Sequence, residues 1–292
     1  MQIYFFLLLF TLIGCRSDRS KYVEAFLKVK DDLGREVIIK EKPSRIISLA
    51  PNITEILFAL DSGKTLAAVT DYCDYPQAAS TKPSVGGMIA PNFEKISEIK
   101  PDLILMTVEG NNQTDFNKLL NLNYTVYVLK PKNIEGIFKS ILDLGRIISA
   151  EGSANQLIIE MRRKQGIIMN ERRTQTLPKV FIVISLQPLI SAGKETFINE
   201  LVTSAGGINI AAESLLQYPI INREEVLKQN PDVIIVMSDG AKSIEDVVNR
   251  FPEWKKTEAF KKHKIKIVDA DILSRPGPRI IDGLKFIASV IF

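Results

Sequence analysis

Hydrophobic and polar positions follow the same order at two places in the chain, 130 residues apart. Segments 94–106 and 224–236 each predict a short amphipathic helix, a Pro-Asp turn and a buried strand. Asn92 and Asn222 precede the two segments and are expected to cap the helices. The spacing is too wide for a solenoid repeat, whose period is roughly 20–50 residues. The pattern therefore predicts two similar α/β lobes, and a cleft between lobes is a common place for a small ligand.

Short apolar runs alternate with amphipathic segments through both halves of the chain, which predicts mostly parallel sheets with helices on both faces. Residues 26–40 predict a β-hairpin. Asn52 is expected to cap a helix over 53–60, with Glu55 completing a capping box. The other expected strands are 45–49, 66–70, 103–106, 125–129, 179–184, 233–236 and 265–268, and the other helices are 115–122, 196–204, 243–250 and 279–291.

Residues between Pro131 and Pro178 include no proline and place apolar side chains at helical spacing. We expect one long helix here, with Glu151-Gly152 as the point where it could break. At about 1.5 Å per residue, 30–40 helical residues would span roughly 45–60 Å, enough to connect two lobes. The predicted organisation is an N-terminal lobe at 26–132, a linking helix at 133–177 and a C-terminal lobe at 178–292.

The N-terminus predicts export. Residues 3–14 are almost wholly apolar, too short to span a bilayer but suited to the core of a signal peptide. Residues 12–15, Leu-Ile-Gly-Cys, resemble a bacterial lipobox, which implies a signal peptide over 1–15, a lipid on Cys15 and a tether over 16–25. Met1-Gln2 carries no basic residue, so we expect either an upstream start codon or an atypical signal. A plain cleaved signal is the alternative to the lipoprotein signal. We expect a protein lipid-anchored to the bacterial cell membrane, facing the periplasm or the exterior.

The composition argues against several other functions. The chain has 292 residues and a net charge of +4, with its basic residues scattered, which gives little support for nucleic-acid binding. It has one histidine, His263, and two cysteines, too few for a nucleophile–His–acid site or a direct zinc site. Serine-hydrolase, P-loop and dinucleotide motifs do not occur in it. We therefore predict no catalytic residue and no protein-bound metal.

Extended stretches of the chain resemble the periplasmic binding proteins of iron-siderophore and vitamin B12 import systems. The stretches that carry the resemblance are 45–60, 70–76, 85–87, 92–94, 100–104, 191–196, 205–209, 222–224 and 274–281. The resemblance implies a monomeric substrate-binding component of an ABC importer, partnered by a permease dimer and its ATPase. It also implies a large organometallic ligand in the interlobe cleft, cobalamin first, with a ferric siderophore or haem as the alternative. A surface interaction lipoprotein and an enzyme are the remaining possibilities.

Glu94 and Glu224 match the permease-docking glutamates of that family. One carboxylate on each lobe could meet arginines of a two-fold symmetric permease. The alternative is that each merely favours the positive end of its helix dipole, which contributes about 0.3–1 kcal/mol.

Seven residues match ligand-contacting positions of the B12-binding members. Tyr72 and Tyr218 would offer flat rings to a corrin. Their alternative role is packing beside Pro76 and Pro219. Asp271 and Arg275 would bind peripheral amides, or would form a surface ion pair instead. The remaining positions, which are aromatic in the B12-binding members and not here, are Met88, Thr107 and Ile190.

Overall fold

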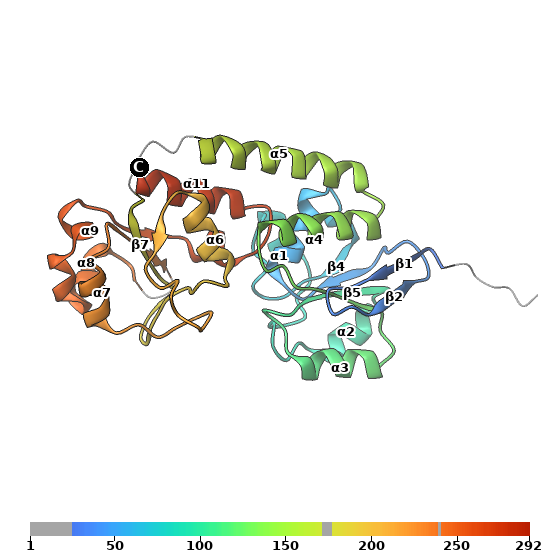
Figure 1. Cartoon of the computed structure of the whole chain (residues 1–292). Coiled ribbons are helices and arrows are strands. Elements are labelled where there is room, and N and C mark those ends of the chain that lie inside the picture. Colours follow the sequence, from blue (N-terminus) through green and yellow to red (C-terminus); the bar gives the residue numbers. More distant parts are fainter. Residues whose placement is uncertain (1–24, 171–176, 239–240) are drawn as a thin grey trace, which may run out of the picture.

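The computed structural model describes residues 25–170, 177–238 and 241–292, and these form two α/β lobes side by side (Figure 1). Each lobe is built on a four-stranded parallel sheet, ordered β4-β3-β5-β6 in the first and β10-β7-β11-β12 in the second. The N-terminal sheet comprises β3 (Ile46–Ser48), β4 (Leu66–Ala68), β5 (Leu103–Thr107) and β6 (Val126–Leu129). The C-terminal sheet comprises β7 (Lys179–Val183), β10 (Ile208–Asn209), β11 (Val233–Met237) and β12 (Ile265–Val268). Two antiparallel pairs accompany them, β1 (Leu27–Lys30) with β2 (Glu36–Ile39) and β8 (Ser185–Leu186) with β9 (Leu189–Ile190).

Helices cover the faces of both sheets, as the alternating pattern predicts. The N-terminal lobe carries α1 (Pro51–Ala59), α2 (Phe93–Ile99), α3 (Gln113–Asn121) and α4 (Ile134–Ile147). Helix α5 (Glu151–Asn170) lies across both lobes. The C-terminal lobe carries α6 (Phe197–Ser204), α7 (Arg223–Gln229), α8 (Ile244–Arg250), α9 (Glu258–Lys261), α10 (Ala270–Ser274) and α11 (Ile280–Ile291).

The sequence repeat is a structural repeat, because α2-β5 and α7-β11 hold equivalent places in the two sheets. The aspartate of each Pro-Asp turn binds the start of the neighbouring strand. Asp102 Oδ2 accepts hydrogen bonds from the backbone N–H of Ser44 at 2.7 Å and of Arg45 at 2.9 Å. Asp232 Oδ2 accepts one from Lys179 N at 3.0 Å. The duplicated motif thus joins each helix to the central pair of strands in its lobe.

The ends of α2 and α7 are also alike. Asn92 and Asn222 are the N-caps, with side chains that accept hydrogen bonds from backbone N–H groups in the first turn at 3.0 Å each. Lys100 and Asn230 close the two helices in the left-handed conformation, with φ of 50° and 48°. The predicted caps are confirmed in both lobes.

The segment predicted as one long helix is two helices. Helix α4 ends at Ile147, Ser149 adopts a left-handed φ of 56°, and α5 begins at Glu151. Helix α4 then packs along α5 in the N-terminal lobe. A Cβ on Gly145 would stand 2.6 Å from the Cβ of Ala154, so glycine allows the two helices to approach closely.

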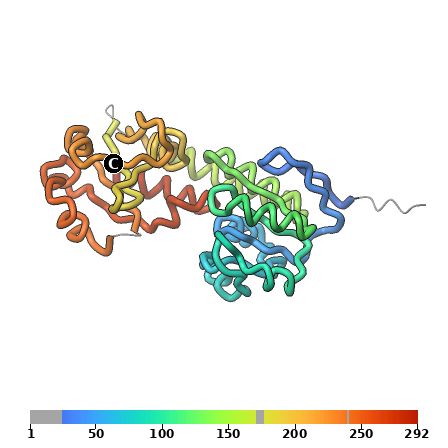
Figure 2. Tube along the Cα trace, turned by 90° about the horizontal axis from the view of Figure 1, so that it is seen from below, coloured from blue at the N-terminus to red at the C-terminus, as the bar shows by residue number. Residues whose placement is uncertain are grey.

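Helix α5 makes the link between the lobes. It packs against α4 of the N-terminal lobe and against α11 of the C-terminal lobe. Its 20 residues run along one long side of the molecule (Figures 1 and 2). The buried side chains of Ala154, Ile158, Met161 and Ile168 form its inner face and belong to the core shared with α11. Such packing along a continuous helix restrains relative movement of the lobes.

The expected capping box at Asn52 is wrong. Helix α1 begins at Pro51, Ala50 is its N-cap, and no side chain caps it. Proline is favoured at the first helical position, where the missing N–H costs nothing, so the helix starts earlier than the asparagine suggests. Asn52 and Glu55 are instead buried at the junction of the lobes.

The predicted signal peptide, Cys15 and most of the tether lie outside the described residues. In the ranges that the structure does describe, no helix is long and apolar enough to cross a membrane.

Candidate ligand cleft and docking surface

A cavity of about 220 Å³ lies between the lobes, at the carboxyl ends of the N-terminal strands. Open α/β sheets bind ligands at this edge, where the loops after successive strands converge. Both lobes contribute to its walls, and five of the seven predicted ligand residues line it: Tyr72, Met88, Thr107, Asp271 and Arg275. Residues far apart in the chain therefore meet at one site, as the prediction requires.

Two tyrosines give the cleft exposed aromatic surface. Tyr72 follows β4 and is 59% exposed, and Tyr218, from the C-terminal lobe, is 49% exposed. Burial of the hydroxyl raises the pKa of Tyr218, and the carboxylate of Glu109 in the N-terminal lobe raises that pKa further. Tyr218 is not among the residues that line the 220 Å³ cavity. Neither tyrosine ring is packed away in the core.

The floor of the cavity holds two polar atoms without partners. Asn52 is 3% exposed and Thr107 is 4% exposed, and both line the cavity. Among the described residues, Asn52 Nδ2 and Thr107 Oγ1 have no hydrogen-bond partner. A buried unpaired polar group costs about 1–3 kcal/mol, so such atoms at a cavity wall indicate a ligand with complementary groups.

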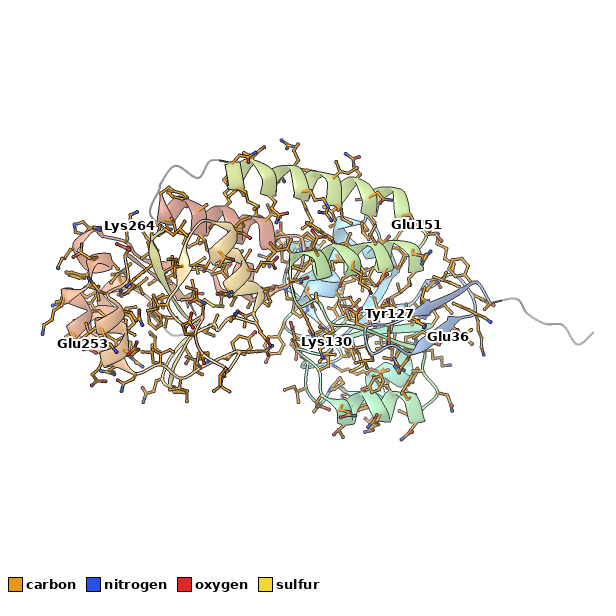
Figure 3. All side chains as sticks on the ribbon, in the orientation of Figure 1. Glu36, Tyr127, Lys130, Glu151, Glu253 and Lys264 are labelled. Carbon is orange, nitrogen blue, oxygen red and sulfur yellow. The ribbon has the colours of Figure 1, made fainter. Side chains whose placement is uncertain are left out.

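Glu109 supplies a third polar group on the N-terminal side. Burial raises the pKa of its carboxyl, and Lys130 offsets part of that effect. Figure 3 shows Lys130 at the side of the N-terminal lobe that faces the other lobe. The cavity therefore combines an acceptor at Glu109 with the amide donor at Asn52.

A buried ion cluster joins the two lobes directly behind this cavity. Glu55 of α1 has a side chain only 2% exposed. Its Oε1 accepts from Arg279 Nη2 at 2.6 Å and from Arg275 Nη1 at 3.3 Å, and its Oε2 accepts from Arg279 Nε at 2.9 Å. The guanidinium of Arg279 also stacks on Tyr75, 4.1 Å from the ring centre. The cluster fixes the start of α11 against the N-terminal lobe.

Arg275 and Asp271 form an ion pair, and this pair is more buried than the surface ion pair that was the alternative role for these residues. Arg275 Nη2 lies 2.7 Å from Asp271 Oδ2, and Arg275 Nη1 lies 2.7 Å from Asp74 Oδ1. The Arg275 side chain is 11% exposed. Burial raises the pKa of Asp271, with Arg275 opposing that shift. Because Arg275 already meets three carboxylates, it has little charge left for an acidic ligand.

Ile190 does not line the cavity. It pairs with Ile220 in an isolated antiparallel bridge, next to the hydrogen bond from Ser191 N to Pro219 O at 3.0 Å. Its place is therefore beside the loop that carries Tyr218. The only tryptophan, Trp254, is fully buried and stacks on Phe251 with ring centres 4.3 Å apart, so it packs in the core of the C-terminal lobe.

Sequence reasoning missed Glu109, the role of Asn52 and the partners of Glu55. Glu109 could have been found, because it follows the predicted strand 103–106 at the carboxyl edge of the sheet. Glu55 gives no such signal, since Arg279 lies 224 residues away in the chain.

Glu94 and Glu224 both lie exposed in the first turns of the equivalent helices α2 and α7. Neither carboxylate forms a salt bridge with another residue in the described ranges. The neighbouring Glu225 accepts a hydrogen bond from Gln229 Nε2 at 2.8 Å. The first turns of the two helices thus each present a free carboxylate, at Glu94 and at Glu224.

Comparison with known proteins places the chain in a family. A family model described as "Periplasmic binding protein" matches residues 46–272. The chain belongs to the periplasmic binding protein family. These proteins bind substrates for transport and are not enzymes.

Individual relatives match nearly the whole chain. An uncharacterized ABC transporter substrate-binding lipoprotein of Bacillus subtilis is 31% identical, over 94% of this chain and 89% of its own. The periplasmic vitamin B12 binding protein BtuF of Vibrio cholerae is 29% identical in sequence. Its crystal structure matches with a TM-score of 0.75, over 86% of this chain and 97% of its own. A possible iron-binding periplasmic solute-binding protein of Staphylococcus epidermidis is 29% identical with a TM-score of 0.77, covering 86% and 100%. This periplasmic binding protein therefore belongs to the substrate-binding components of ABC importers.

Proposed function

We propose that this periplasmic binding protein captures cobalamin in the interlobe cleft and delivers it to an ABC permease. The observation that carries the proposal is the cavity built by both lobes, with an exposed aromatic side chain at Tyr72 and unpaired polar atoms at its floor. A corrin is a broad, mainly apolar disc fringed with amides. Tyrosine rings offer it stacking area with a polar tip.

The polar groups of the cleft suit amides better than carboxylates. Glu109 and Asp271 line the cavity, and burial raises the pKa of both, so each is costly to keep charged there. Amide N–H groups of a ligand would satisfy these carboxylates. Ligand amide oxygens would in turn accept from Asn52 Nδ2.

A haem would add two carboxylates to the same site. Among the described residues, the only basic one that lines the cavity is Arg275, which is occupied by Glu55, Asp74 and Asp271. An acidic ligand would therefore meet Glu109 and Asp271 without a free cation in the cavity wall, and like charges repel. A ferric siderophore is the second candidate, because the S. epidermidis relative, described as a possible iron-binding protein, is as similar in sequence (29% identity) as the B12 binding protein.

Equilibrium dialysis of the purified protein against cyanocobalamin, haemin and a panel of ferric siderophores tests the ligand. We expect cyanocobalamin to be retained at one molecule per protein, with haemin and the siderophores weaker by at least tenfold. Tight retention of a siderophore or haemin with no retention of cyanocobalamin would refute the assignment.

We propose further that Glu94 and Glu224 dock the protein onto its permease. Both carboxylates are exposed and unpaired within the described ranges, on equivalent helices of the two lobes. Arginines on a two-fold symmetric permease would bind one carboxylate of each lobe. The double variant Glu94→Ala/Glu224→Ala should keep wild-type ligand affinity and lose uptake in reconstituted vesicles.

The matched control for docking is Glu98→Ala combined with Glu245→Ala, which removes two exposed carboxylates elsewhere on α2 and α8. This control should transport normally. Normal transport by the Glu94/Glu224 variant would disprove the docking role.

We also propose that Cys15 carries a lipid anchor. Two observations support the anchor: the lipobox-like sequence at residues 12–15, and the similarity to the B. subtilis relative, which is described as a lipoprotein. Cys15→Ala should move the exported protein from the detergent phase to the aqueous phase on Triton X-114 partitioning. A wild-type protein already in the aqueous phase would contradict the anchor.

A further inference from the structure

A second cavity of about 250 Å³ lies at the same edge of the N-terminal sheet. Its walls are mainly apolar, from β5, β6, α3 and the β1–β2 turn, and include Leu33, Met106, Val108, Phe116 and Val128. Ligand pockets usually measure about 300–1,000 Å³, so this cavity could hold one arm of a ligand rather than a whole ligand.

The second cavity adjoins the ligand cavity through Thr107, which lines both. The hydroxyl of Thr107 is buried and has no partner among the described residues. Met88 and Gly110 complete the wall on the ligand-cavity side. A Cβ on Gly110 would collide with the terminal methyl of Met88, so glycine provides the space that the Met88 side chain occupies. The partition is therefore Thr107, which both cavities share, and the Met88 side chain, whose three rotatable bonds allow it to move, lies beside it on the ligand-cavity side.

The backbone around this partition is firmly held. Asn111 Nδ2 donates to Leu49 O at 2.9 Å and to Met88 O at 2.8 Å, while its Oδ1 accepts from Thr107 N at 2.9 Å. Asp115 Oδ2 accepts from Ala90 N at 2.8 Å. These bonds fix the two loops on either side and leave the Met88 side chain as the movable part. They also use the polar groups of Asn111, so within the part of the chain that the structure describes, the Thr107 hydroxyl is the one buried polar group of this cavity without a partner.

We propose that the second cavity is a compartment of the ligand site and takes a flat, mostly apolar arm of the ligand that presents one polar edge to Thr107. The proposal rests on the proposed function and extends it. A bicyclic aromatic base bearing methyl groups fits this description, and cobalamin carries such a base on its nucleotide chain. The corrin would then occupy the cleft beside Tyr72, and the base would lie beyond Met88.

The test compares two corrinoids, cyanocobalamin and dicyanocobinamide, which lacks the base, by calorimetric titration. Val108→Trp fills the second cavity without entering the cleft, and Val108 is partly exposed, which favours a folded product. We expect this variant to weaken cyanocobalamin binding about tenfold or more, since burying an apolar group of this size contributes more than one factor of ten. Binding of dicyanocobinamide should stay unchanged.

Thr107→Val removes the hydroxyl with little change of shape and should weaken cyanocobalamin more than dicyanocobinamide, because Thr107 lines the second cavity as well as the ligand cavity. Leu122→Trp, at the exposed end of α3, is the matched control and should bind both corrinoids like the wild type. Equal losses for both corrinoids in Val108→Trp, or no loss for either, would overturn the compartment while leaving the proposed function intact. A wild-type protein that binds neither corrinoid would overturn the proposed function and the compartment together.

Discussion

Glu55→Gln should destabilise the protein strongly, because Glu55 is the buried carboxylate that joins the lobes. The substitution keeps the size of the side chain and removes its charge. Arg275 would keep Asp74 and Asp271, each at 2.7 Å. Arg279, whose side chain is 14% exposed, would lose the carboxylate it meets through two nitrogens.

The expected loss of stability follows from what happens to Arg279, because Arg275 keeps two carboxylates and Arg279 loses the one it contacts. Removing one partner of a buried ion pair costs about 3–5 kcal/mol, because the remaining charge stays buried and unpaired. Glutamine retains one acceptor oxygen, which places Glu55→Gln near the lower figure, ~3 kcal/mol. A chain of this size loses about 2–4 °C of melting temperature per kcal/mol, so we expect a fall of roughly 6–12 °C.

The assay is thermal unfolding at pH 7, followed by circular dichroism, with Asp74→Asn as the matched control. Asp74 also contacts Arg275, but its side chain is 62% exposed. Exposed ion pairs contribute about 0–1 kcal/mol, so the control should fall by only a few degrees. If Glu55→Gln melts within about 2 °C of Asp74→Asn, burial of the cluster does not stabilise the lobe junction and the reasoning fails.

Three further predictions concern the cleft. Burial raises the pKa of Glu109 above the ordinary value of 4.5, so this carboxylate binds its proton more tightly in the folded protein than in the unfolded chain. The free energy of unfolding therefore falls as the pH rises from 4.5 towards the folded pKa. Glu109→Gln should remove that fall, and its melting temperature relative to wild type should rise between pH 4.5 and 7; a constant difference would contradict the shift. Asn52→Leu should stabilise the ligand-free protein by about 1 kcal/mol, because it removes an unpaired buried donor. The same variant should bind cyanocobalamin more weakly in calorimetry. Unchanged affinity would show that Asn52 Nδ2 does not contact the ligand. Gly110→Ala should displace the Met88 side chain and change the affinity for cyanocobalamin. Combining Gly110→Ala with Met88→Ala should restore that affinity. A double variant with no better affinity than Gly110→Ala alone would contradict the contact between residue 110 and Met88.

The sequence predicted the two-lobed α/β fold because its local signals agree with one another. Asn92 and Asn222 precede equivalent helices, and the Pro-Asp turns that follow lead into buried strands. In the structure, Asp102 and Asp232 bind equivalent strands. Each of these motifs acts within a short stretch or repeats in both lobes, which is why pattern analysis detects them.

The sequence indicated a possible break at Glu151-Gly152, next to the observed one, but it did not indicate that the chain reverses there. Ser149 takes a left-handed conformation there, at a place without the glycine or proline that usually marks a helix end. Apolar residues keep helical spacing on both sides, so periodicity alone does not separate one long helix from two packed ones. The reversal depends on the close contact of Gly145 with Ala154, which is a tertiary feature.

The candidate site was predictable where the family resemblance names positions, and less so where chemistry depends on distant partners. Tyr72, Thr107 and Asp271 line one cavity as expected. The involvement of Glu55 was not visible, because a glutamate three residues after an asparagine also fits a capping box and its true partners lie more than 200 residues away. Buried ion pairs of this kind leave no local pattern.

The most direct test of the account is a calorimetric titration of cyanocobalamin into the wild-type protein and into Tyr72→Ala/Tyr218→Ala. Each aromatic stacking contact contributes roughly 0.5–1.5 kcal/mol beyond area burial, so the double variant should bind at least several-fold more weakly, with one site per protein in both cases. Equal affinity in the two proteins, or a wild type that gives no heat of binding, would contradict a corrinoid site between the lobes.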